Sequence, residues 1–137
     1  MNGIAAARRR SANEVSRAVI TAAMRVHSVL GPGLLESAYE ACLIYELQKI
    51  GLAVESQVGL PVVYEGVKWD LGYRIDPLVD GLIIVEIKSI EALAPIHQAQ
   101  VLSYLKLSGK SLALLINFNV VHLRDGIKRF VLGTGWK

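Results

Sequence analysis

The chain has 137 residues, of which 53% are hydrophobic and 20% charged, and its formal net charge is +3. This length suits one domain, and the apolar content excludes a disordered protein. The absence of an uninterrupted apolar stretch of roughly 18–20 residues argues against a membrane protein. The single cysteine, Cys42, excludes an intrachain disulfide and a cysteine-based zinc site. It also fits a cytoplasmic location. Residues 1–10, which end in Arg8-Arg9-Arg10, are expected to form a flexible basic tail, and residues 11–137 a single domain.

Two helices are predicted at the start of this domain. Ser11 and Glu14 have the spacing of a capping box, and the apolar residues that follow recur on one helical stripe as far as Leu30. Gly31-Pro32-Gly33 ends this helix. A second helix is expected from about Leu34 to Ile50, with Gly51 as its stop.

The pattern then changes to short segments rich in β-branched residues, which predict strands. The expected strands before the third helix cover residues 52–58, 60–64, 67–76 and 82–88. Asp80-Gly81 is a hairpin signal, and the strand Leu82–Lys88 stays apolar almost to its end, so we expect it to be central and covered on both faces. A helix over residues 95–107 and strands over residues 110–119 and 127–132 complete an α/β sandwich with a mixed sheet.

Polar side chains at the end of this central strand are unexpected for a purely structural element. Glu86 and Lys88 point to the same face, because side chains alternate along a strand. Asp76 precedes the hairpin and joins Glu86 only if the register departs from a strict two-residue loop, so we expect an irregularity between Asp76 and Leu82. Oxygen ligands without cysteine suit magnesium or manganese.

These residues resemble a known signature. Asp76, nine intervening residues and then Glu86-Ile87-Lys88 resemble the motif of the PD-(D/E)XK nuclease superfamily. Gly33-Leu34-Leu35-Glu36-Ser37-Ala38-Tyr39 is similar to the motif of the GxxExxY family within that superfamily. The resemblance extends over roughly residues 14–133. It implies a restriction-endonuclease-like α-β-β-β-α-β core, with a mixed central sheet flanked by helices.

The resemblance also implies roles for individual residues. Asp76, Glu86 and the backbone carbonyl of Ile87 would bind Mg²⁺ or Mn²⁺, and Glu36 would complete the metal site. Lys88 would orient the attacking water. Gln100 and Tyr104 resemble the QxxxY motif of RecB-like members and share a helix face. His27 occupies a position where some RecB-like members have a metal ligand, and whether it joins the site stays open.

Each of these assignments has a structural alternative. Glu36 could be an ordinary solvated residue, Asp76 a turn residue, and Glu86 with Lys88 an ion pair at a strand end. Gln100 and Tyr104 could simply pack on the sheet, and His27 could be a packed or capping histidine.

The expected function is metal-dependent hydrolysis of phosphodiester bonds in DNA. The alternative is a catalytically inactive member of the superfamily that binds nucleic acid or another protein. The few charges on an apolar chain also lead us to expect a homo-oligomer.

Overall fold

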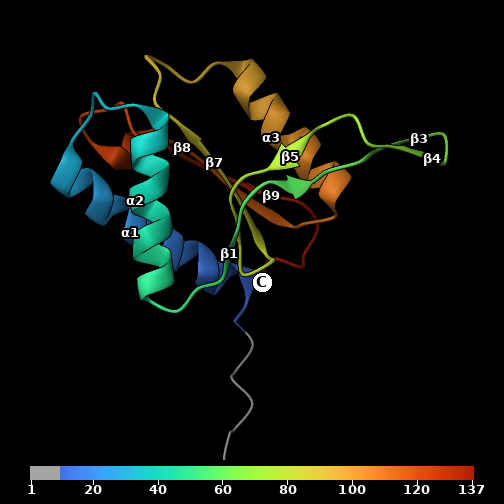
Figure 1. The fold of residues 1–137 in the computed structure, drawn as a ribbon, viewed down its shortest axis with the longest axis horizontal. Helices are drawn as coiled ribbons and strands as arrows, with labels where there is room; N and C mark the ends of the chain where they lie inside the picture. The colour runs from blue at the N-terminus through green and yellow to red at the C-terminus, as the bar shows by residue number, and fades with distance from the viewer. Residues whose placement is uncertain (1–9) are drawn as a thin grey trace, which may run out of the picture.

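The computed structural model describes residues 10–137, which contain helices α1 (Ala12–Leu30), α2 (Glu36–Lys49) and α3 (Pro95–Ser108). The expected tail over residues 1–10 lies outside this range, apart from Arg10, whose guanidinium is 3.1 Å from the carboxylate of Asp80. Figure 1 shows α1 and α2 together on one side of the sheet and α3 on the other. Within residues 10–137, no helix has the length and apolar content needed to cross a bilayer.

A five-stranded sheet separates the helices. Its order is β1-β6-β7-β8-β9, and the strands are β1 (Val54–Glu55), β6 (Leu78–Val79), β7 (Ile83–Lys88), β8 (Leu112–Asn117) and β9 (Ile127–Val131). Only β7 and β8 run parallel, and the other neighbours are antiparallel. The helix α3 connects these two strands, because parallel neighbours need a long crossover connection, which is usually a helix. The predicted α/β fold with a mixed sheet and helices on both faces is therefore confirmed.

The central position predicted for β7 is also confirmed. It pairs with β6 on one side and with β8 over six residue pairs on the other. Ile83, Val85 and Ile87 belong to the core beneath α1 and α2. Ile84 packs in the second core, beneath α3. A strand buried on both faces needs apolar side chains at consecutive positions, which explains the unbroken apolar run.

The hairpin between β6 and β7 has the irregularity that the sequence led us to expect. Val79 pairs with Ile83, so the loop has three residues, Asp80, Gly81 and Leu82. Asp80 and Gly81 have φ values of 53° and 64°, in the left-handed region that favours glycine and tolerates aspartate. The three-residue loop shifts the pairing by one position relative to a two-residue hairpin.

Two of the predicted strands were too long. Residues 52–58 divide between β1 and β2 (Val58–Gly59), which belong to different sheets. Residues 67–76 divide between β4 (Val67–Trp69) and β5 (Arg74–Ile75). β2 pairs with β5, and β3 (Val62–Tyr64) pairs with β4, so a separate ribbon extends along the α3 side (Figure 1). Asp70 causes the second break, because its carboxylate accepts hydrogen bonds from the Gly72 amide and the Arg74 guanidinium, both at 3.2 Å.

The helix starts follow from local chemistry. Ser11 caps α1 as predicted, since its side chain accepts a hydrogen bond of 3.1 Å from the Glu14 amide. The helix α2 starts at Glu36, two residues later than predicted, and has no side-chain cap. The carboxylate of Glu36 therefore lies in the first helical turn, where the exposed amide groups favour a negative charge.

Tyr39 fixes the turn between α1 and α2. Its side chain is fully buried, and its ring stacks on Phe118 with centroids 4.6 Å apart. Its hydroxyl donates to the Gly31 carbonyl at 2.6 Å and accepts from the Leu34 amide at 3.1 Å. One buried tyrosine thus joins the end of α1, the start of α2 and the segment after β8.

We expect Tyr39→Phe to lower the free energy of unfolding by about 1–3 kcal/mol, because both backbone groups lose a buried partner. Urea unfolding monitored by circular dichroism measures the change. Tyr45→Phe is the matched control, since Tyr45 is 63% exposed and its change should stay within about 0.5 kcal/mol. Equal effects of the two substitutions would contradict the anchoring role of Tyr39.

Candidate active site

The core of the candidate site is the end of β7. Glu86 and Lys88 leave the apolar strand on one face, and the Lys88 Nζ lies 3.6 Å from Glu86 Oε1. Both side chains are 20% exposed, so the pair is mostly shielded from solvent but remains accessible. The predicted pairing of these two groups is present, and it places a carboxylate and an ammonium together at a strand end.

Asp76 approaches this pair from the segment between β5 and β6. The Val85 amide donates to the Pro77 carbonyl at 3.1 Å, which continues the β6–β7 pairing and brings Asp76 opposite Glu86. The side-chain amide of Gln57 donates to Asp76 Oδ2. Among the described atoms, Asp76 Oδ1 is buried and has no hydrogen-bond partner. A buried acceptor without a partner is costly, so this oxygen is available to a ligand.

The helix α2 adds two further carboxylates, Glu36 and Glu40. They are four residues apart and therefore lie on one helix face. The pKa of Glu40 is raised, first by partial burial and then by the charge of Asp76 and a hydrogen bond with it, with smaller effects from Glu36 and Glu86. The charges of Asp76, Glu36 and Glu86 thus all act on Glu40.

Glu86 shares this electrostatic environment. Burial is the largest influence on its pKa and raises it, and the charges of Glu36 and Asp76 act in the same direction. The ammonium of Lys88 opposes them without reversing the net rise. The site therefore holds more negative charge than its one ammonium group offsets, which is the condition that favours a bound cation.

Comparison with known proteins agrees with this geometry. The sequence profile of the PD-(D/E)XK nuclease superfamily matches residues 13–130. The chain belongs to the PD-(D/E)XK nuclease superfamily. No curated protein and no solved structure shows a significant match to the chain.

Nucleases of this superfamily generally use divalent metal ions, and the donor set here fits one. Carboxylate oxygens dominate the cluster, and Asp76 supplies an unpartnered buried oxygen. Across residues 10–137, no three acidic, histidine or cysteine side chains already stand in the arrangement of a metal site. The fit therefore rests on the chemistry of the donors and on their mutual repulsion, which a bound cation would relieve.

The other predicted residues have different surroundings. The side chain of Ile87 is buried in the core beneath α1 and α2, between the two polar residues of the superfamily motif. Gln100 and Tyr104 contact each other, with the amide nitrogen 3.4 Å from the hydroxyl. Tyr104 also meets Tyr73 edge to face, at 6.2 Å between ring centroids. They line a cavity between α3 and the ribbon, and the lining of this cavity includes none of the four carboxylates.

His27 is a packed residue in this structure. It is 8% exposed, and its Nε2 lies 2.8 Å from the Val120 carbonyl, so the ring holds the end of α1 against the segment after β8. This contact gives His27 a structural role whether or not it has another.

Sequence reasoning missed two residues that interact with Asp76 in the candidate site, Glu40 and Gln57. The spacing of Glu40 from Glu36 is a signal that could have identified it. Gln57 carried no such signal, because its contact with Asp76 depends on a backbone φ of 57° that few residues other than glycine adopt. Unusual backbone conformations of this kind are often found at functional sites.

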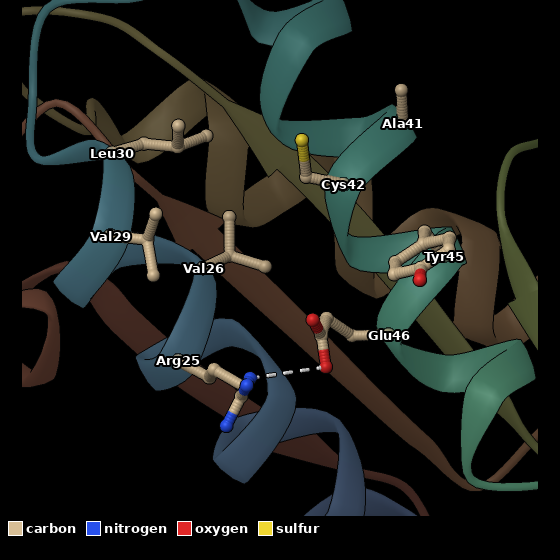
Figure 2. A pocket seen from close by; sticks show the side chains of 8 residues that line it. All are labelled: Arg25, Val26, Val29, Leu30, Ala41, Cys42, Tyr45 and Glu46. Carbon is tan, nitrogen blue, oxygen red and sulfur yellow. Dashed lines mark ion pairs between the residues drawn. The ribbon is translucent and has the colours of Figure 1, made fainter.

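A separate cavity of about 260 Å³ lies between α1 and α2 (Figure 2). Its lining is mainly apolar and includes Cys42 and Tyr45, and the Arg25–Glu46 ion pair at 3.4 Å closes one side. None of the residues of the acidic cluster lines it. This cavity is distinct from the candidate active site.

The charge crowding predicts a gain of stability when one carboxylate is neutralised. Because the folded-state pKa of Glu40 is raised above 4.5, its ionised form disfavours the fold, and metal-free stability falls as the pH rises above that value. In EDTA at pH 7, Glu40→Gln should therefore raise the free energy of unfolding by about 0.5 kcal/mol, a value limited by solvent screening. The gain should vanish near pH 4, where the Glu40 carboxyl of the wild type is mostly protonated and therefore uncharged, like the glutamine side chain of the variant.

Chemical unfolding at both pH values tests this prediction. Glu91→Gln is the control, since Glu91 is exposed and is not among the charges that shift the pKa of Glu40 or of Glu86. A loss of stability in Glu40→Gln at pH 7 would show that Glu40 supports the fold rather than straining it.

Proposed function

We propose that this chain is a metal-dependent nuclease that hydrolyses phosphodiester bonds in DNA, and that it belongs to the GxxExxY group of the superfamily. The observation that carries the proposal is the meeting of Asp76, Glu86 and Lys88 at the end of β7, next to the acidic face of α2. An isolated ion pair at a strand end would not require the additional carboxylates, which repel one another unless a cation is present.

Each residue has a distinct task in this proposal. Asp76, Glu86 and Glu36 would hold Mg²⁺ or Mn²⁺, with the Ile87 carbonyl as a further ligand. When bound, such an ion lowers the pKa of a water molecule and offsets charge on the phosphate. Lys88 orients the attacking water and contributes positive charge beside the phosphate. Gln100 and Tyr104 position the substrate from α3.

The reaction is a hydrolysis. The water oxygen forms a bond to phosphorus, and the bond from phosphorus to the 3′ oxygen breaks. The 3′ oxygen takes up a proton and leaves as a hydroxyl, and the other product ends in a 5′-phosphate.

Cleavage of plasmid and oligonucleotide DNA with Mg²⁺ or Mn²⁺ tests the proposal. We expect wild-type protein to cleave and the double variant Glu86→Ala/Lys88→Ala to lose activity by at least about 10²-fold, since proton transfer and charge stabilisation each contribute on that scale. The double variant Glu91→Ala/Lys110→Ala removes the same charges outside the cluster and should retain activity. Equal cleavage by the wild type and the first variant would refute the assignment.

Metal binding can be measured independently of activity. Saturating Mg²⁺ or Mn²⁺ should raise the melting temperature of the wild type, with about 2.7 kcal/mol of stabilisation at 100 times the dissociation constant. Asp76→Asn should abolish this rise, and Asp125→Asn, at an exposed position outside the cluster, should preserve it. An intact fold with no metal-dependent shift would favour a protein that binds nucleic acid without cleaving it.

A further inference from the structure

A further cavity lies between the end of α1 and the segment that follows β8. Its volume is about 510 Å³. The walls come from two places, the turn after α1, with Gly31 and Pro32, and residues 121–124, which lead into the 3-10 helix η1 (Leu123–Gly126). The cavity has no part in the metal-binding cluster described above.

Arg124 gives this cavity a positive charge. His27 and His122 also line it, and no acidic residue does. His122 and Arg124 are exposed, and neither side chain has a hydrogen-bond or ion-pair partner within residues 10–137. Asp125, the nearest acid in sequence, instead lines a neighbouring cavity together with Lys128.

Both walls are attached to the strand end that carries Lys88. On one side, the Ser89 hydroxyl donates to the Leu34 carbonyl at 2.6 Å, within the turn that continues from Pro32. On the other side, the Phe118 amide donates to the Lys88 carbonyl at 2.9 Å, three residues before Val121. Tyr39 connects the two sides through its hydroxyl and its stacked ring. The cavity is therefore held in a fixed relation to the proposed catalytic groups.

We infer that this cavity is a subsite for a backbone phosphate of the nucleic-acid substrate, bound by Arg124 and His122. The inference rests on the proposed function, since it names how the same substrate is held. An unpaired guanidinium presents two parallel donors that match a phosphate, and an imidazole adds a third. A cation would find no carboxylate here.

The inference also accounts for the modest net charge. Nucleic-acid binding by general charge attraction requires many basic residues, and this chain has a formal charge of only +3. An unpaired guanidinium with a neighbouring imidazole, in a cavity without carboxylates, holds the backbone locally instead.

Fluorescence anisotropy with a labelled 20-base-pair oligonucleotide duplex tests the subsite in EDTA, so that binding is measured without cleavage. For the full chain, Arg124→Gln should weaken binding and reduce the slope of log affinity against log salt by about 0.9, the value for one lost phosphate contact on duplex DNA. Adding His122→Gln to Arg124→Gln should weaken binding further. Arg17→Gln is the matched control, because Arg17 is exposed on α1 and does not line the cavity.

A loss of duplex affinity in Arg124→Gln that Arg17→Gln does not reproduce supports the subsite. This holds even if the protein does not cleave DNA, because the absence of cleavage would refute only the proposed nuclease activity. Equal losses in the two variants, or no oligonucleotide binding by the wild type, overturn the subsite. A thermal-shift measurement with inorganic phosphate distinguishes a site for free phosphate from a site for a phosphate of the nucleic-acid backbone. If phosphate raises the melting temperature of the wild type but not of Arg124→Gln, while both bind the duplex equally, the cavity is a small-anion site and the inference is overturned.

Discussion

The pairing register between β6 and β7 is the constraint on which the candidate site depends. β7 is fixed by six pairs with β8, so the loop of Asp80, Gly81 and Leu82 decides which residue of the preceding segment meets Glu86. Three loop residues bring Asp76 opposite Glu86. A loop one residue shorter would turn Asp76 to the other face of the sheet, because side chains alternate along a strand. The position of Asp76 in the acidic centre thus depends on the left-handed backbone conformations of Asp80 and Gly81, in the loop at the other end of the β6–β7 hairpin.

The gathered carboxylates carry an energetic cost that the fold tolerates. Burial and mutual repulsion raise the pKa of Glu40 and of Glu86, which means that both are destabilising when ionised without a cation. The elements that carry them are held by other contacts. β7 has a core on each face, and α2 is anchored by the buried Tyr39. Stable elements that hold repelling groups in place are typical of a site prepared for a ligand.

The sequence predicted the helices, β7 and β8 well, because their capping residues, apolar periodicity and unbroken apolar runs are local signals. It failed for residues 52–58 and 67–76, where β1, β2 and β5 are strands of two residues set by pairing partners farther along the chain. The motif pointed to Asp76, Glu86 and Lys88, and the register expected from Pro77 and the loop was correct. Glu40 and Gln57 enter the site only through tertiary packing, of α2 against Asp76 and of a left-handed turn beside it.

The proposed function accounts for the separation of the acidic centre from the basic cavity. A metal-binding centre needs carboxylates that are not neutralised by neighbouring cations, and a phosphate subsite needs cations that are not neutralised by carboxylates. Within residues 10–137, Lys88 forms an ion pair with Glu86 in the acidic centre, whereas His122 and Arg124 line the cavity that the turn of Gly31 and Pro32 borders. Tyr39 and Ser89 both hydrogen-bond to this turn, so the same contacts that fix the start of α2 also fix one wall of the basic cavity.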